Sequence, residues 1–136
     1  MLGLLEGKMP GGIPPELACL VLDALPVDMT FIDKDDVVRY YSGHRIFSRT
    51  HKILGTLVQN CHSPASRQAV DKVIDDLKRG RAQVIEQLSK KGGHPVRVLY
   101  LAVRDERGEY AGLVEMCQWV KEKKAKPPPK AQPGDI

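Results

Sequence analysis

Two adjacent residues with reactive side chains, Cys61 and His62, stand in the stretch VQNCHSPAS. Each could serve as a metal ligand, and together they could act as a nucleophile and its general base. The positive end of a helix beginning at Pro64 would favour a reactive thiolate at Cys61. A catalytic pair also needs an orienting Asp or Asn, which is not visible here, and adjacent side chains point in different directions. We therefore expect Cys61 to be a small buried hydrophobe and the protein not to be an enzyme, with Cys61/His62 catalysis kept as a third hypothesis.

The imidazole of His62 has two open roles. Its ring could hydrogen-bond to backbone where the helix begins, or it could face a pocket. In a pocket, a neutral imidazole could hydrogen-bond a small ligand or ligate a haem iron. Haem is thus an alternative cofactor with His62 as its axial ligand, and the identity of any cofactor stays unknown. No other metal site is expected, because the three cysteines are widely spaced and form no CxxC pair.

The net charge of +4 is concentrated in the final segment, KEKKAKPPPKAQPGDI, which carries five lysines and two acidic residues. The rest of the chain is nearly neutral, so we expect no nucleic-acid partner. No apolar run is long enough to cross a membrane or to act as a secretory signal, which predicts a cytoplasmic protein with free thiols. We expect a flexible extension over residues 1–15, one domain over 16–120 and a disordered, basic, Pro-rich tail over 121–136.

Two helices and an irregular segment are predicted. Apolar residues at near-helical spacing predict a short amphipathic helix over 16–25, and the segment 44–61 loses any period and predicts one or two helical turns. The strongest signal covers 64–79, where Ser63 can cap the first turn and Gly80 can end the last. The apolar stripe that this helix would bury consists of Val70, Val73, Ile74 and Leu77.

Five strands complete the expected architecture. Runs rich in β-branched and aromatic residues are separated by the turn-like sequences KDD, KKGG and ERGE. Two neighbouring strands open the domain and three close it, with the helices between them. This order predicts an α+β fold, in which short helices cover one face of a five-stranded antiparallel sheet. The strands are expected at 27–33, 37–43, 82–89, 95–105 and 110–120.

The runs LPVDMTFID, VVRYYSGHRIFSRT and LGTLVQNCHSPAS, with the closing pair around AVRDERGEYAGLVEM, resemble the PAS module of an uncharacterised bacterial and archaeal family. In that family the module is often joined to a hemerythrin-like domain. The resemblance implies a PAS fold whose sheet cups a pocket beneath the short helices and serves sensing and dimerisation.

The resulting functional hypothesis is a small stand-alone sensory module that binds a small molecule and signals to a separate partner protein. A homodimer is the expected assembly, with the N-terminal helix and the outer sheet face as its surfaces. The alternative is a haem- or metal-binding redox or gas sensor that uses His62. Arg45 and Arg49 are expected to be solvated, or else to clamp an anionic ligand. The residues predicted to bind the ligand are Tyr41, Phe47, Cys61, His62, Val98 and Val114.

Overall fold

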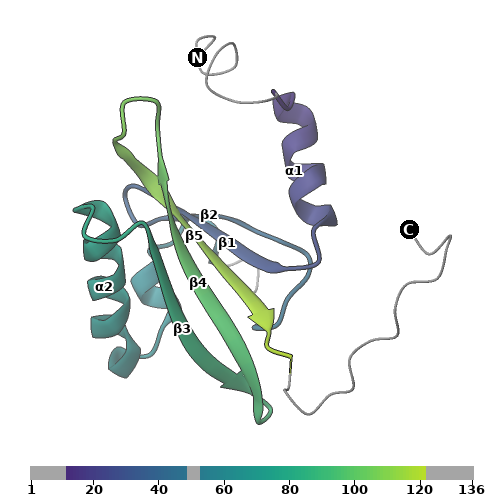
Figure 1. Cartoon of the computed structure of the whole chain (residues 1–136), viewed down its shortest axis with the longest axis vertical. Coiled ribbons are helices and arrows are strands. Elements are labelled where there is room, and N and C mark those ends of the chain that lie inside the picture. The colour runs from purple at the N-terminus through teal and green to yellow at the C-terminus, as the bar shows by residue number, and fades with distance from the viewer. Residues whose placement is uncertain (1–11, 49–52, 122–136) are drawn as a thin grey trace, which may run out of the picture.

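The computed structural model describes residues 12–48 and 53–121, and within them the predicted α+β architecture is confirmed (Figure 1). All strand pairs are antiparallel, and the order across the sheet is β2-β1-β5-β4-β3. The first strand therefore pairs with the last, which brings the two ends of the domain together. The elements in chain order are α1 (Pro15–Ala24), β1 (Asp28–Asp33), β2 (Val38–Tyr41), η3 (Val58–Cys61, a 3-10 helix), α2 (Pro64–Lys78), β3 (Val84–Lys91), β4 (His94–Arg104) and β5 (Tyr110–Trp119).

The three hairpins follow from local turn chemistry. Asp33 Oδ1 accepts hydrogen bonds from the backbone N–H groups of Asp35 and Val37, and Asp105 Oδ1 closes the β4–β5 turn in the same way. An aspartate that binds backbone N–H groups two and four residues ahead stabilises a tight reversal. The β3–β4 turn instead uses Gly92 and Gly93, both at positive φ, as a two-residue hairpin loop requires.

One face of the sheet is covered by α2 and η3, and the core lies between this face and the two helices. Val73, Ile74 and Leu77 of α2 are buried against Ile32 of β1 and Leu113 of β5. The packing beneath α2 leaves a void of only about 10 Å³, room for no more than about one water molecule. The apolar stripe read from the sequence is thus confirmed as the packing face of this helix.

Both ends of α2 fall where the sequence predicted, within one residue. Ser63 occupies the N-cap position, but its hydroxyl hydrogen-bonds to Ser66 Oγ rather than to the backbone of the first turn. At the other end Gly80 has φ 74°, and Arg104 of β4 donates to the carbonyl oxygen of Leu77 at 2.6 Å. The guanidinium adds a second hydrogen bond to this carbonyl, which also accepts from the backbone N–H of Gly80 at 3.2 Å.

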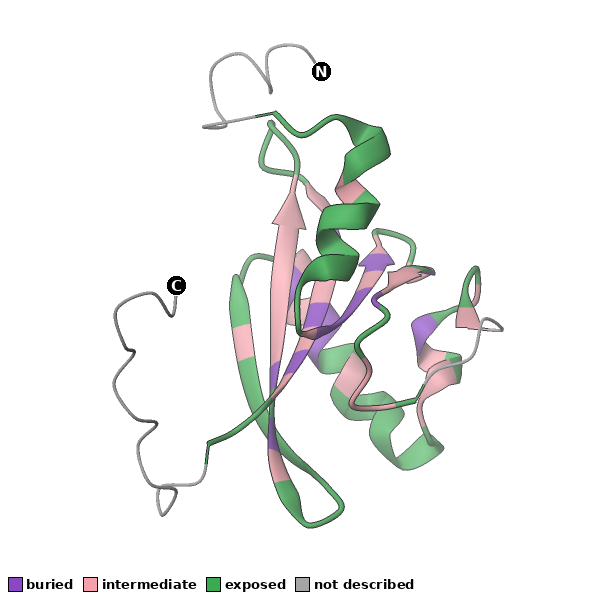
Figure 2. Ribbon diagram, turned by 90° about the vertical axis from the view of Figure 1, so that its right-hand side faces the viewer, coloured by how far each residue is buried: buried purple, intermediate pink, exposed green. Residues whose placement is uncertain are grey.

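The predicted N-terminal helix is present as α1, but it lies on the side of the sheet opposite α2, and none of its residues is buried (Figure 2). Tyr40 Oη donates to Asp23 Oδ1 at 2.5 Å and ties the helix to β2. Burial, followed by this contact with Asp23, raises the pKa of the Tyr40 hydroxyl. No helix in the described ranges has the length and apolar character needed to cross a membrane. The terminal extensions predicted for 1–15 and 121–136 fall outside these ranges, apart from the few residues adjoining α1 and β5.

Gly112 of β5 provides a test of the sheet packing. Its φ is 150°, and a Cβ atom there would lie 2.3 Å from the carbonyl oxygen of Ile32 and 2.9 Å from the ring of Phe31. Gly112→Ala should lower the free energy of unfolding by about 1–3 kcal/mol, because backbone and ring must shift apart. Urea unfolding checks this, with Gly43→Ala as the matched control, since a Cβ at Gly43 meets nothing within 4 Å. Equal losses in the two variants would contradict the packing described.

Candidate functional site

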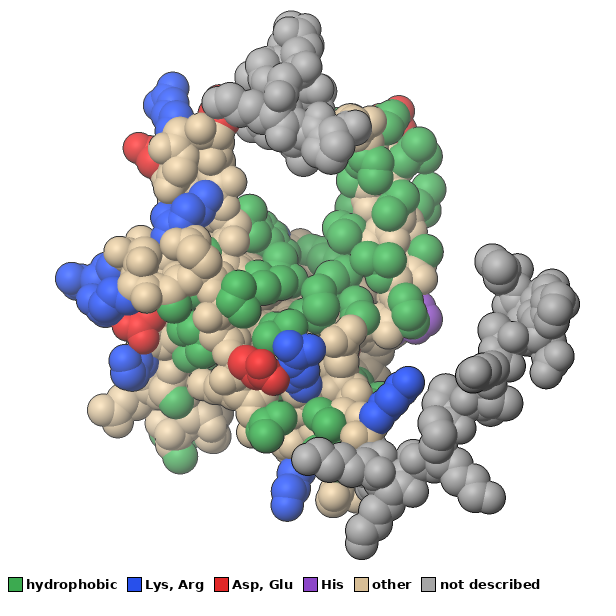
Figure 3. Space-filling view, viewed as in Figure 1, with side chains coloured by type: hydrophobic (Ala, Val, Ile, Leu, Met, Phe, Trp, Pro, Cys, Tyr) green, Lys and Arg blue, Asp and Glu red, His purple; other side chains and the backbone are tan. Residues whose placement is uncertain are grey.

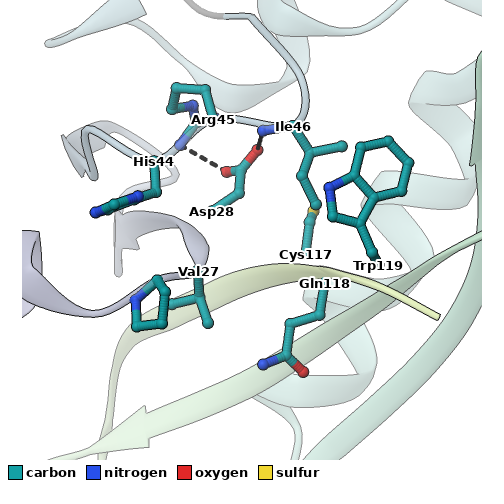
Figure 4. A pocket seen from close by; sticks show the side chains of 9 residues that line it. Val27, Asp28, His44, Arg45, Ile46, Cys117, Gln118 and Trp119 are labelled. Carbon is teal, nitrogen blue, oxygen red and sulfur yellow. Dashed lines mark hydrogen bonds and ion pairs between the residues drawn. The ribbon is translucent and has the colours of Figure 1, made fainter. Parts of the chain in front are cut away.

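The site begins with a buried carboxylate at the first residue of β1, Asp28, which is 3% exposed. Its Oδ2 accepts a hydrogen bond from the backbone N–H of Ile46 (2.8 Å), and its Oδ1 pairs with Arg45 Nη1 at 2.6 Å (Figure 4). The backbone N–H of Phe47 also donates to Oδ2, at 3.0 Å. Three consecutive residues of the loop after β2 are thus bound to one side chain. This loop is held against the sheet by charge and by backbone hydrogen bonds together.

The guanidinium of Arg45 is half-buried and structural, so the expectation that it is solvated is wrong. Besides Asp28, it donates to the backbone oxygens of Met29 at 3.0 Å and Phe47 at 3.3 Å. Its Cζ lies 5.4 Å from the centre of the Tyr41 ring, a cation–π distance. Tyr41 therefore supports the arginine, and it does not line any of the pockets described below. Arg49 lies outside the described residues.

The Asp28–Arg45 pair forms part of the wall of a hollow of about 550 Å³ near the end of β5 (Figure 4). Its carboxylate and guanidinium neutralise each other, and both also bind backbone groups. The two charged side chains of this hollow already hold the loop in place, so they are not available to a ligand. We therefore do not take this hollow as the candidate ligand site, although it is larger than the second pocket described next. The residues that line it are Pro26, Val27, Asp28, His44, Arg45, Ile46, Cys117, Gln118 and Trp119.

A second pocket, of about 280 Å³, lies between this loop, the residue after η3 and the covered face of three strands. Strand register explains its floor: Gln87 of β3 pairs with Val98 of β4, and Tyr100 of β4 pairs with Glu115 of β5. Paired residues project from the same face of a sheet. We call this space the loop pocket. It is lined by Phe47, His62, Gln87, Ser89, Val98, Tyr100 and Glu115.

Three of the six predicted ligand-binding residues meet in the loop pocket: Phe47, His62 and Val98. Cys61 instead packs against the core beneath α2, and its Sγ lies 4.0 Å from the carbonyl oxygen of Leu57. The expected burial of Cys61 is therefore partial, and its thiol and the His62 ring lie in different surroundings. This separation argues against the Cys61/His62 catalytic pair.

The expectation that Val114 faces inward is corrected by the strand register. Glu115 lines the loop pocket, and side chains alternate along β5, so Val114 projects from the opposite face. There it lines an apolar hollow of about 350 Å³ between α1 and the sheet. The run LVEMC does not by itself specify which alternate residues of β5 face the side of the sheet that α2 covers.

Four residues of the loop pocket were not predicted: Gln87, Ser89, Tyr100 and Glu115. One signal for them was available, since Glu115 is a lone charge within an otherwise apolar run of a central strand. A charged residue at such a position is rarely buried without a specific role. Gln87 and Ser89, two residues apart on β3, needed the pairing with β4 before they could be placed. Within 12–48 and 53–121 no three His, Cys, Asp or Glu side chains group as a metal site would require.

Comparisons with known proteins agree with this geometry. Residues 19–120 match a family model described as PAS domain. The chain is similar to a C-terminal domain from Streptococcus mutans, with 33% identity and a TM-score of 0.75 over 83% of this chain and 90% of that one. It shares the fold of the PAS domain of BvgS from Bordetella pertussis, at 16% identity and a TM-score of 0.64 over 79% of this chain and 87% of that one.

A sensory box sensor histidine kinase from Vibrio cholerae also shares the fold, at 14% identity and a TM-score of 0.58 over 79% of this chain and 92% of that one. No match was found among curated protein sequences. The structural likenesses below 25% identity concern the fold, and the family match covers most of the chain.

Removing the carboxylate that holds the loop should cost much of the stability of the domain. Asp28→Ala is expected to lower the free energy of unfolding by about 3–5 kcal/mol, because it leaves Arg45 half-buried without its counter-charge. The control is Glu86→Ala, which removes the exposed Arg97–Glu86 pair (2.8 Å) and should cost less than about 1 kcal/mol. Urea unfolding measures the free energy of unfolding of both variants. Similar decreases in the two would contradict the role of Asp28 in holding the loop to the sheet.

Proposed function

Because this chain belongs to the PAS domain family, we propose that it is a sensory and protein-interaction module that binds a small molecule in the loop pocket. PAS domains are generally sensory rather than catalytic. The observation that carries the proposal is the contrast between two parts of the covered face. Beneath α2 the core is packed with a void of about 10 Å³, whereas the loop pocket leaves about 280 Å³ beside polar side chains. A pocket lined by several polar side chains, next to a close-packed core, is typical of a ligand site.

A route for the signal runs from the pocket to α1. Phe47 lines the loop pocket, and its N–H is bound by Asp28 at the beginning of β1. The short connection from α1 to β1 is itself hydrogen-bonded, with Leu25 N donating to Leu22 O and Val27 N donating to Leu25 O. A ligand that displaces Phe47 would therefore act on the residue next to this connection. The position of α1 is the proposed output.

The connection is reinforced by a fully buried hydroxyl. Ser42, directly after β2, donates to the carbonyl oxygen of Val27 at 2.9 Å and accepts from Met29 N at 2.9 Å. The loop that carries Phe47 starts at this serine. Both ends of the loop segment from Ser42 to Phe47 are thus bonded to the beginning of β1, which favours movement as one unit.

The receiving surface is proposed to be α1 together with the outer face of the sheet, occupied by a second copy of the chain or by a separate signalling protein. Apolar side chains gather on α1 and on the sheet beside it (Figure 3). Leu17, Leu20 and Val21 are exposed, Leu20 to 65%. Exposed apolar surface of this extent on a helix is typical of an interface. A cytoplasmic location and a homodimer remain part of the proposal.

Haem is the weaker candidate for the ligand. His62 does line the loop pocket, as an axial ligand would. A porphyrin, however, needs a wide apolar slot for its ring, whereas the walls around His62 include the carboxylate of Glu115, the amide of Gln87 and the hydroxyls of Ser89 and Tyr100. These residues do not fit a haem, and we assign His62 the role of a hydrogen-bonding group toward a smaller molecule.

The pocket is tested by native mass spectrometry of the protein as isolated. We expect a retained small molecule and no Soret band in the absorption spectrum. His62→Ala should lower the retained fraction several-fold, since a hydrogen bond to the ligand is lost. His94→Ala is the matched control, because His94 lies at the β3–β4 turn beside Trp119 and does not line the loop pocket. No adduct, or equal loss in both variants, would contradict the proposal, and a Soret band lost in His62→Ala would assign haem instead.

The interface is tested by placing a charge on α1. Leu20→Glu should convert a dimer into a monomer, because a carboxylate buried at an apolar interface has no counter-charge there. Leu57→Glu is the control, since Leu57 is exposed just before η3, on the side of the domain away from α1. Sedimentation equilibrium reports the masses. A wild-type monomer, or a Leu20→Glu dimer of unchanged stability, would contradict the proposed surface.

A further inference from the structure

We propose that the free edge of β3 pairs with the same edge of a second copy of the chain, in an antiparallel register centred on Leu88. This inference goes beyond the proposed function, because it concerns the edge of the sheet rather than α1 and requires no ligand. β3 is the last strand of the sheet, and its one strand partner among the described residues is β4 (Figure 1). An edge strand presents a row of backbone N–H and C=O groups on its free side.

The backbone groups on this free side belong to alternate residues. Ala102 N donates to the carbonyl oxygen of Gln83 at 2.9 Å, one residue before β3 begins. In an antiparallel pair, residues bonded to the neighbouring strand alternate with residues whose N–H and C=O groups point away from it. The even-numbered residues of β3 therefore direct these groups toward the free side. They are Val84, Glu86, Leu88 and Lys90.

The edge lacks features that commonly prevent strands from pairing. β3 contains no proline, and its register with β4 runs from Val84 to Lys91 without a bulge. Leu88, in the middle of the free side, is 74% exposed, the highest value among the exposed large apolar side chains of residues 12–48 and 53–121. A straight edge with an exposed apolar side chain at its centre favours pairing with another strand.

The charges on β3 specify a second copy as the occupant. Gln87 and Ser89 line the loop pocket, so the even-numbered residues project from the opposite, outer face. When Leu88 lies opposite Leu88 of a second copy, Glu86 lies opposite Lys90 of that copy, and the same pair recurs on the other side of the axis. Opposite charges that face each other across two strands stabilise the pair, whereas like charges destabilise it. The edge is thus complementary to itself.

Other registers of the same two edges are less favourable. A register centred on Glu86 or on Lys90 would place two like charges opposite each other. A register centred on Gln87 would place Glu86 opposite Leu88, which leaves the charges without opposite partners. Within the chain, Arg97 Nε pairs with Glu86 Oε1 at 2.8 Å and holds this carboxylate on the outer face. A carboxylate has several acceptor sites, so Glu86 can also accept from a lysine of the second copy.

The contact joins one short strand of each copy, and we therefore expect it to be weak. A stable interface buries roughly 1,200–2,000 Å², and a single pair of strand edges supplies only part of that area. Association is expected at about 1 mM, whereas the surface at α1 is measured in dilute solution. The pairing gains strength where another contact already concentrates the copies.

A charge-swap experiment tests the pairing, in the full chain carrying Leu20→Glu so that the surface at α1 does not contribute. Backbone amide NMR signals are followed as the concentration rises to about 1 mM. The amides of Glu86, Leu88 and Lys90 should shift with concentration. Glu86→Lys and Lys90→Glu should each suppress these shifts, because each variant places like charges opposite each other. An equimolar mixture of the two should associate at least about tenfold more tightly than either alone, since every opposed pair then has opposite signs.

Two further variants separate strand pairing from a general effect of charge. Leu88→Pro should abolish association in the mixture as well, because it removes an N–H group from the free side; the fold tolerates it, since that group does not bond to β4. Lys34→Glu makes the same change of net charge as Lys90→Glu but lies in the β1–β2 turn. It should leave the association unchanged.

Several results would overturn the pairing. They are an absence of concentration-dependent shifts up to about 1 mM, shifts located away from β3, unchanged association in Glu86→Lys, and association of the mixture that survives Leu88→Pro. None of these results bears on the proposed function. The loop pocket is judged by the molecule retained in the protein as isolated, and the surface at α1 by the mass of Leu20→Glu in dilute solution.

Discussion

The carboxylate of Asp28 is the interaction on which the rest of this structure depends. It joins the first strand to a loop 17 to 19 residues further along the chain, through an ion pair with Arg45 and two backbone hydrogen bonds. Burying one carboxylate and one guanidinium carries a desolvation cost, which their mutual attraction and the added hydrogen bonds offset. Because Phe47 is a wall of the loop pocket, the shape of that pocket follows from this anchor.

The sheet separates two surfaces of different character. On the covered side, Tyr100 and Glu115 lie between the packed core beneath α2 and the open loop pocket, and they border both. On the other side, apolar residues of the strands and of α1 surround a hollow of about 350 Å³. Because side chains alternate along β5, Glu115 faces the loop pocket while Val114 faces the hollow beside α1. A single strand thus contributes to both surfaces.

The coupling that we propose between these surfaces rests on connectivity rather than on a long chain of contacts. The loop that carries Phe47 is bonded to Asp28, and only the short hydrogen-bonded connection from Leu25 to Val27 separates Asp28 from α1. α1 has no buried residue of its own, so little packing energy opposes its movement. A helix held mainly by its connection and by Tyr40 is suited to change position in response to a partner or a ligand.

What the sequence by itself determined is local: the α2 helix with its buried stripe, the hairpin turns at Asp33, Gly92 and Asp105, and the strands that they join. Turn chemistry and apolar periodicity act within a few residues, so they can be read without a fold. Phe47, His62 and Val98 were predicted to line the pocket that the resemblance to a known module implies, and they do line the loop pocket. The tertiary structure alone decided that Val114 faces outward, that Arg45 is bound to Asp28, and that Gln87, Ser89, Tyr100 and Glu115 share one pocket. These facts depend on strand register and on partners distant in the chain, which a local pattern does not specify.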